Sequence, residues 1–410
     1  MAAAPLSPDQ MVKPRHFELR VSLLFVALFI PGGVHLPYFP LWLESAGFGA
    51  SEIAVILAAP MFARVVSTPL ITAYADKAKD RVNVLIACAA ISLLVSFGYF
   101  LQPSYALVLA VSLALVAVWT PHSTLADSLA LSGVRRFRSD YSRMRVWGSV
   151  SFLLASIGGG LILGVTGAVA VPVLISLGMA LTLVAAFAAP RLGRPRFASP
   201  LSAAGIQKAA PSLLNRRFVL FVAGTGLINA SHGLIYAFGS IHWKAIGVGE
   251  TTIGALWAWG VGAEVVLFAV FTRVFGRTSP SRLLGIAAAA AVLRWSAMPF
   301  FGGDAAGLAA FFGLQTLHAL STGLVLLGVQ KMIAETVDDG RIGAAQGAAF
   351  FANGTALAAV TLASGSIYAS LGASGFHIMS LVAVAGAMLI ALGAVQPQSA
   401  GAGGETIEPS

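Results

Sequence analysis

The run Val-Leu-Ala-Val-Ser-Leu-Ala-Leu-Val-Ala-Val at residues 108–118 is interrupted by a single hydroxyl, that of Ser112. A strand of a membrane β-barrel would alternate apolar and polar residues, which this run does not do. A continuous apolar segment satisfies its backbone hydrogen bonds inside a bilayer by forming a helix. The pattern therefore predicts a transmembrane helix, and similar runs recur along the chain.

The composition of the whole chain supports the same interpretation. Of its 410 residues, 58% are apolar and only 10% are charged, whereas soluble domains carry about 25% charged residues. These proportions exclude a cytosolic enzyme, a secreted domain and a disordered regulator. The single cysteine, Cys88, excludes an intrachain disulfide framework. We expect an all-α integral membrane protein.

Twelve apolar runs are long enough to cross a bilayer, which takes roughly 20 helical residues. They cover approximately residues 21–43, 51–73, 83–101, 105–130, 146–165, 170–189, 217–240, 250–272, 283–301, 305–330, 343–368 and 375–395. The chain is therefore predicted to form twelve transmembrane helices.

The basic residues fall in alternate connections between these runs. If the N-terminus is cytoplasmic, all but three of the 25 lysines and arginines lie in cytoplasmic segments, and only Lys244 lies in an outer loop. This asymmetry predicts that both termini face the cytoplasm. It also accounts for the net charge of +9 without a nucleic-acid partner. The other two basic residues, Arg64 and Arg294, fall inside apolar runs.

An internal repeat predicts two similar halves. A shift of 200 residues aligns 47–66 with 247–266, and seven of twenty positions are identical. This alignment places the second apolar run on the eighth, as a duplicated six-helix unit requires. We predict an N-terminal bundle at 1–190, a cytoplasmic linker at 191–216, a C-terminal bundle at 217–396 and a disordered cytoplasmic tail at 397–410.

Short segments of the chain resemble known transporters. Residues 74–81 resemble the first cytoplasmic signature of the major facilitator superfamily. The segments Leu-Pro-Tyr-Phe-Pro-Leu-Trp-Leu at 36–43 and Arg-Val-Trp-Gly-Ser at 145–149 are similar to the phenylpropionate-permease-like family. The resemblance implies two six-helix bundles in the cell inner (plasma) membrane, which rock around a central site. It assigns a gating loop to Asp76, Lys77 and Arg81.

The charged residues are also similar in position to those of lactose permease. Asp127 in the fourth run and Arg145 at the start of the fifth match an acid and an arginine of that family. Phe152 stands where the sugar permease stacks its ligand on a tryptophan. We expect Asp127 and Arg145 to face each other across neighbouring antiparallel helices, where they either bind ligand or close the inner gate.

Glu264, Arg294 and His318 resemble the proton-coupling residues of the same permease. One departure is Ser321, three residues after the histidine, where the permease has a carboxylate. An ionisable group inside a bilayer costs about 2.5–3.5 kcal/mol on insertion scales and is functional by default. We therefore expect proton coupling to involve Glu264, Asp127, His318 and Arg294.

The candidates for substrate binding combine charged, polar and aromatic side chains. They are Arg64, Asp127, Arg145, Phe152, His35, Trp119, Tyr236 and Trp257. Arg64 and Arg294 are each expected to pair with an acid, because an unpaired guanidinium in lipid is costly. A purely structural ion pair remains the alternative for both, and lipid contact the alternative for the tryptophans. Weaker candidates are His122, His232, Asn229 and Asn353.

The sequence contains no phosphate loop, no zinc motif and no nucleophile elbow. We therefore expect no enzyme activity, no catalytic residues, no cofactor and no metal site. The expected partners are a small-molecule substrate, protons and the lipid bilayer, and we expect a monomer.

The charges of the candidate residues favour an anionic substrate. Three arginines, Arg64, Arg145 and Arg294, face two acids, Asp127 and Glu264. A monoanion would neutralise the remaining positive charge. We predict a secondary active transporter that couples protons to symport of a small organic anion, such as the aromatic carboxylate phenylpropionate, by alternating access. A sugar or nucleoside symporter, an exporter of the same fold and, more remotely, a non-transporting membrane sensor are the alternatives.

Overall fold

The computed structural model describes residues 12–193, 215–338 and 341–394. The predicted tail at 397–410 and most of the predicted linker at 191–216 lie outside these residues. Every regular element within the described ranges is a helix, which confirms the all-α prediction.

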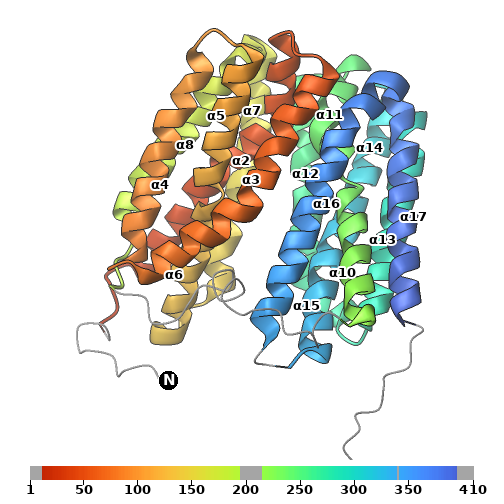
Figure 1. The fold of residues 1–410 in the computed structure, drawn as a ribbon. Helices are drawn as coiled ribbons and strands as arrows, with labels where there is room; N and C mark the ends of the chain where they lie inside the picture. Colours follow the sequence, from red (N-terminus) through yellow and green to blue (C-terminus); the bar gives the residue numbers. More distant parts are fainter. Residues whose placement is uncertain (1–11, 194–214, 339–340, 395–410) are drawn as a thin grey trace, which may run out of the picture.

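The helices of the two halves of the chain lie side by side (Figure 1). The first half contains α2 (Phe17–Ser45), α3 (Ala50–Lys77), α4 (Arg81–Ser96), α5 (Tyr105–Trp119), α6 (Pro121–Phe137), α7 (Tyr141–Thr166) and α8 (Val171–Ala188). The second half contains α10 (Arg216–Ala230), α11 (Gly233–Ala245), α12 (Glu250–Phe275), α13 (Pro280–Ala297), α14 (Ala305–His318), α15 (Leu324–Thr336), α16 (Ile342–Leu371) and α17 (Gly375–Ala394).

Eleven helical stretches of the described chain are long and apolar enough to cross a membrane. The last of them, residues 342–394, contains α16 and α17, which are joined by the short 3₁₀ turn Gly372–Ser374. The structure thus shows a multi-pass helical membrane protein.

Breaks near the middle interrupt some of these stretches, where the sequence predicted continuous helices. α5 ends at Trp119, and α6 begins at Pro121, which has no N–H to continue the hydrogen-bond ladder. α10 ends at Ala230, and α11 starts at Gly233 after a turn. The π-helical turn Ala319–Gly323 separates α14 from α15, and such turns are frequent at functional sites. The breaks bring polar groups into the interior.

Side-chain oxygens cap several helix N-termini. Asp80 accepts a hydrogen bond from Val82 N at the start of α4, and Asp140 caps α7 in the same way. Asn215 and Asp304 cap α10 and α14. These polar residues explain where the apolar stretches begin, because each satisfies a backbone N–H that the helix leaves free.

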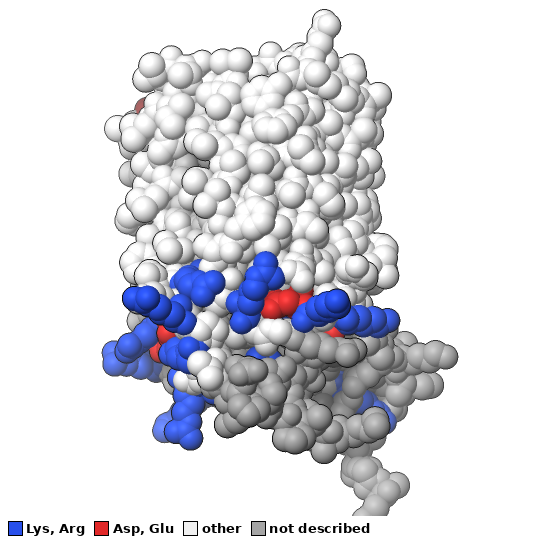
Figure 2. Space-filling model, turned by 90° about the vertical axis from the view of Figure 1, so that its left-hand side faces the viewer, with Lys and Arg blue, Asp and Glu red and all other residues white. Residues whose placement is uncertain are grey.

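A band of Lys and Arg, with a few acidic side chains, crosses one end of the molecule, and the rest of the face in view is almost entirely uncharged (Figure 2). This is the end at which α2 begins and α3 ends, at the bottom of Figure 1. We refer to it as the basic end.

The two halves meet closely at the end opposite the basic end. α3 contacts α16, α7 contacts α12, and α2 contacts α11. A Cβ atom on Gly254 would lie 2.1 Å from Tyr38 Oη and 2.3 Å from Ser156 O. A Cβ on Gly160 would lie 2.6 Å from the carbonyl oxygen of Glu250. The absence of a side chain at these glycines therefore lets the backbones of α7 and α12 touch.

Candidate functional site

A cavity of about 420 Å³ lies between the two halves. Its wall is formed by α2, α3, α5, α6 and α7 from the first half and by α11, α12, α14 and α16 from the second. Sequence-predicted residues that line it are His35, Arg64, Trp119, Phe152, Tyr236, Trp257 and His318. The size suits a small-molecule ligand. Asp127, Arg145, Glu264 and Arg294 do not belong to this wall.

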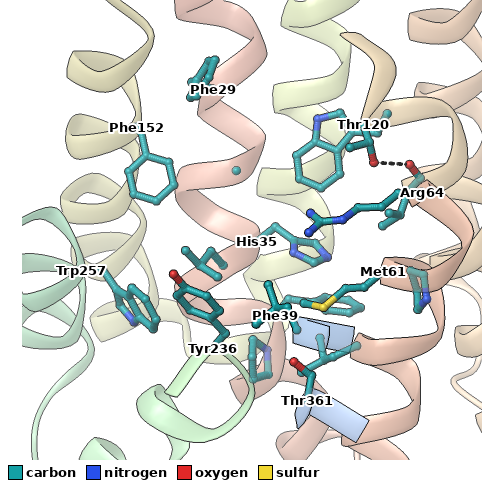
Figure 3. A pocket seen from close by; sticks show the side chains of 18 of the residues that line it. Phe29, His35, Phe39, Met61, Arg64, Thr120, Phe152, Tyr236, Trp257 and Thr361 are labelled. Atoms are coloured by element: carbon teal, nitrogen blue, oxygen red, sulfur yellow. Dashed lines mark hydrogen bonds between the residues drawn. The ribbon is translucent and has the colours of Figure 1, made fainter. Parts of the chain in front are cut away.

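Aromatic rings form much of the cavity wall (Figure 3). Tyr236 and Trp257 stack on each other with ring centroids 6.1 Å apart. His35 stacks on Phe39 at 4.5 Å and meets the ring of Trp119 edge-on at 5.3 Å. The wall therefore offers flat apolar surfaces from both halves of the chain.

Among the described residues, Arg64 is the arginine that lines the cavity. Its side chain extends from α3 toward the middle of the space, and Trp257 lies on the opposite side (Figure 3). Arg64 has no hydrogen bond or ion pair within the part of the chain that the structure describes. The prediction that Arg64 pairs with an acid is therefore wrong for the described part of the chain. Its side chain is half-buried in the cavity wall.

Asp127 and Arg145 face each other, as predicted. Arg145 Nε lies 3.8 Å from Asp127 Oδ1, and Tyr141 Oη donates to the same oxygen at 2.9 Å. The guanidinium also lies over the ring of Phe29, 4.2 Å from its centroid. Phe29 lines the cavity, whereas the pair itself stands behind it, about a turn into α7 from the basic end. The pair is thus built into the first half.

Arg294 is held without a carboxylate. Its side chain is 1% exposed, and its Nη1 lies 3.1 Å from His318 Nδ1. Its Nη2 donates to the amide oxygen of Gln315, and the ring of Trp295 covers the guanidinium at 4.6 Å. The expected pairing with an acid is therefore wrong among the described residues, because neutral acceptors and an aromatic face surround the cation instead.

His232 and Ser321 extend this polar cluster. His232 Nε2 lies 2.9 Å from Ser321 Oγ, and His232 Nδ1 lies 3.2 Å from the carbonyl oxygens of Ile228 and Asn229. Ser321 is the residue that departs from the lactose permease pattern. Ser321 lies in the π-helical turn Ala319–Gly323, and the histidine that it contacts lies in the turn between α10 and α11.

Glu264 lies in α12, half-buried and away from the cavity wall. Thr322 Oγ1 donates to its carboxyl at 3.4 Å. Its helix contacts α7 of the other half, the helix that carries Arg145. Glu264 is therefore an acid at the interface between the halves.

The predicted gating loop forms a buried ion pair. Arg81 Nε and Nη2 donate to Asp76 Oδ1 at 2.9 and 2.6 Å, and the side chains are only 9% and 12% exposed. Lys77 ends α3 beside them. The pair ties the end of α3 to the start of α4 at the basic end.

Sequence reasoning missed some wall residues. Gln315 lines the cavity and orients Arg294, and a polar residue one turn before His318 was the available signal. Thr361 also lines it, from α16. His122, a weaker candidate, belongs to the wall as well. Thr361 is one hydroxyl in a small-residue run, so nothing in the sequence distinguishes it from a packing residue.

A central cavity between two halves of a helical membrane protein is the arrangement used by secondary transporters. A family model described as the MFS_1 like family matches residues 18–379. The chain belongs to this family. It is a membrane transporter of the major facilitator type, a class of transport proteins and not of enzymes.

Relatives of this MFS_1-like transporter carry different substrate names. The probable 3-phenylpropionic acid transporter of Escherichia coli (strain K12) is 28% identical over 364 residues, 89% of this chain and 94% of the relative. The maltose permease of Geobacillus stearothermophilus is 29% identical over 286 residues, 67% and 69% of the two chains. The crystal structure of the nucleoside transporter NupG has a TM-score of 0.77 at 14% identity, covering 93% of this chain and 100% of that one. The family resemblance inferred from the sequence is confirmed.

Proposed function

We propose that this transporter is a proton symporter of a small organic anion, with an aromatic carboxylate such as 3-phenylpropionate as the expected substrate. It works by alternating access: the two halves rock around the central cavity. The observation that carries the proposal is Arg64, a guanidinium in the cavity wall without an acid partner among the described residues.

The charge of the cavity supports an anion. Asp127 and Arg145 neutralise each other outside the wall, and Arg294 is buried behind His318. Arg64 is therefore the charged side chain that a ligand meets, and its planar fork matches a carboxylate. A monoanion would neutralise it.

The shape and chemistry of the wall support a ring. The stacked pair of Tyr236 and Trp257 faces Arg64 across the cavity, and Phe152 lines the same space. An aromatic carboxylate would place its ring against these faces and its charge on Arg64. The name of the Escherichia coli relative, a probable 3-phenylpropionic acid transporter, supports the same class of substrate.

Proton coupling is the second part of the proposal. Glu264 is an acid in α12, which contacts α7 of the other half, the helix that carries Arg145, so a change in its protonation would alter the attraction between the halves. The ion pair between Asp127 and Arg145 would carry this change within the first half, and Arg294 is the buried charge of the second half. We place the gating role at the buried pair of Asp76 and Arg81, with Lys77 next to them.

We propose a twelve-span topology with both termini in the cytoplasm of a cell with an inner membrane. Counting α16 and α17 as separate spans adds one to the eleven stretches. The basic end would face the cytoplasm, in accord with the positive-inside rule. The transporter would act as a monomer, because the cavity is formed within one chain.

Sugar symport is the second candidate, because the maltose permease is 29% identical to the chain. Competition in one assay separates the candidates. Labelled 3-phenylpropionate would be bound to the purified protein and displaced by unlabelled 3-phenylpropionate, benzoate, maltose or a nucleoside. We expect displacement by the two carboxylates alone, and a loss of binding of about 10–100-fold in Arg64→Gln, because a hydrogen bond to a charged group contributes about 1.5–3 kcal/mol.

Binding of maltose or of a nucleoside with no binding of either carboxylate would replace the anion proposal by the corresponding alternative. The direction of transport is read in proteoliposomes that carry an inward or an outward proton gradient. Accumulation along the proton gradient supports symport, whereas accumulation against it identifies an exporter.

A further inference from the structure

We propose that His318 is the second anchor of the substrate carboxylate, with its Nε2–H fixed as a hydrogen-bond donor by Arg294. This inference rests on the proposed function, in which the substrate is an organic anion. The carboxylate would then be held by Arg64 from the first half of the chain and by His318 from the second.

The contact between Arg294 and His318 determines the tautomer of the imidazole. Arg294 Nη1 lies 3.1 Å from His318 Nδ1. A guanidinium offers only donors, so Nδ1 must be the acceptor. A neutral imidazole with an accepting Nδ1 carries its proton on Nε2. The doubly protonated ring does not fit this contact, because two donors would then face each other.

Gln315 keeps Arg294 in this position. Its amide oxygen accepts from Arg294 Nη2, and its amide nitrogen donates to the carbonyl oxygen of Leu256 at 2.9 Å. The opposite orientation of the amide would place a donor against the guanidinium and an acceptor against a carbonyl. The network thus has one consistent arrangement. Arg294 is 1% exposed and lies outside the cavity wall, so it is a positioning residue.

The Nε2–H of His318 is left for the cavity. His318 is half-buried in the cavity wall, and its Nε2 has no hydrogen-bond partner among the described residues. Among the described residues, this Nε2 is also not one of the fully enclosed polar atoms without a partner, so it remains accessible. The neighbouring imidazole of His232 cannot accept the proton, because its Nε2 is bonded to Ser321 and its Nδ1 faces backbone carbonyls.

The two anchors stand on different halves. Arg64 belongs to α3 and His318 to α14, and both line the same cavity. A carboxylate has two oxygens that each accept hydrogen bonds. A ligand that engages both donors would connect the halves directly, so the anchors would make occupancy of the cavity favour a conformation that closes around the carboxylate.

Two substitutions at position 318 test the roles of the two ring nitrogens separately. In His318→Asn, the short amide can accept from Arg294 in place of Nδ1, but it offers no donor at the Nε2 position. In His318→Gln, the amide nitrogen reaches the Nε2 position. We expect the affinity for 3-phenylpropionate to fall about 10–100-fold in His318→Asn, and to stay within about threefold in His318→Gln. Unchanged affinity in His318→Asn, or equal losses in both variants, would overturn the proposal.

A second measurement does not depend on the folding of variants at position 318. Nitrogen NMR of the ¹⁵N-histidine-labelled wild type reports which ring nitrogen carries the proton. We expect one histidine with a protonated Nε2 and a bare Nδ1 whose Nε2–H signal shifts when 3-phenylpropionate is added. In Arg294→Met, this tautomer should lose its preference. A ligand-insensitive spectrum would contradict the proposal.

The same binding assay distinguishes failure of this inference from failure of the proposed function. If wild-type protein binds neither 3-phenylpropionate nor benzoate, the anion proposal fails and the His318 anchor fails with it. If Arg64→Gln loses carboxylate binding while His318→Asn retains it, the proposed function stands and the role of His318 alone is wrong.

Discussion

At the scale of single residues, Asp127 and Arg145 show how a charged pair can stand beside a binding site without belonging to it. Their ion pair is supported by Tyr141, and the Arg145 guanidinium lies over Phe29, whose ring lines the cavity. The side chains are 29% and 35% exposed, so water screens the pair in part. We therefore expect it to shape the wall and not to hold the ligand.

Exchange of the two charges tests this. The double variant Asp127→Arg with Arg145→Asp should retain affinity for 3-phenylpropionate within about threefold, because the pair is outside the wall. Each single variant should lower stability by about 1 kcal/mol, since two like charges then face each other in place of the ion pair. Thermal unfolding and competition binding measure the two effects. Loss of binding in a folded double variant would place the pair in the site, as the resemblance to lactose permease implied.

Several site residues were predictable from their position in the middle of an apolar run alone. An ionisable or aromatic side chain in the middle of an apolar run must face the protein interior or lipid, and this indicated His35, Arg64 and Tyr236. The partners of Arg294 were not predictable, because Gln315 and His318 come from another helix and replace the acid that electrostatics favours. Contacts across helices depend on rotation about each axis, which the sequence pattern of an almost uniformly apolar helix does not fix.

At the scale of helices, the contact between α7 and α12 closes the end of the molecule opposite the basic end. Gly160 and Gly254 permit this contact, and Tyr38 Oη lies between the two backbones. The sequence predicted these helices, yet it did not identify which of the many glycines are required. Gly158, in the same helix as Gly160, has nothing within 4 Å of a Cβ placed on it.

Gly160→Ala should therefore open this end, whereas Gly158→Ala should not. The added methyl at 160 would lie 2.6 Å from the Glu250 carbonyl oxygen, so α12 must move away. Both changes raise helix propensity equally, which makes them a matched pair. Spin labels at the exposed positions Ser45 and Ser374, in a Cys88→Ala background, report the separation by pulsed electron resonance. Equal distance distributions in both variants would contradict a closing role for Gly160.

At the scale of the whole molecule, each half carries part of the charge system. Glu264 in the second half lies on α12, which contacts the helix of Arg145 in the first, and Arg145 pairs with Asp127. The overall fold could be predicted from the apolar runs and the repeat, because a chain that crosses a bilayer must satisfy its backbone hydrogen bonds internally. The mid-helix breaks did not follow, since Gly233 and the π-helical turn resemble ordinary packing positions in the sequence.

Glu264→Gln should abolish uphill accumulation while leaving exchange of substrate across the membrane. Glutamine keeps the shape of the side chain and its contact with Thr322, but it does not release a proton. Uptake against a gradient and counterflow in proteoliposomes measure the two activities. Glu250→Gln is the control, because this acid starts the same helix and pairs with Lys244 at 3.0 Å. Continued accumulation in Glu264→Gln would transfer the coupling role to Asp127.

The neutral surroundings of Arg294 also bear on how the protein is made. Its helical stretch, Pro280–Phe300, has a mean hydropathy of 1.5, against 2.3 for Ala168–Ala188. Arg294 lies in the last turn of α13, where an arginine opposes insertion by less than the about 2.5–3.5 kcal/mol that applies at the centre of a helix. Its partners, Gln315 and His318, belong to the helix synthesised next. We therefore expect α13 to enter the lipid together with α14 during biogenesis.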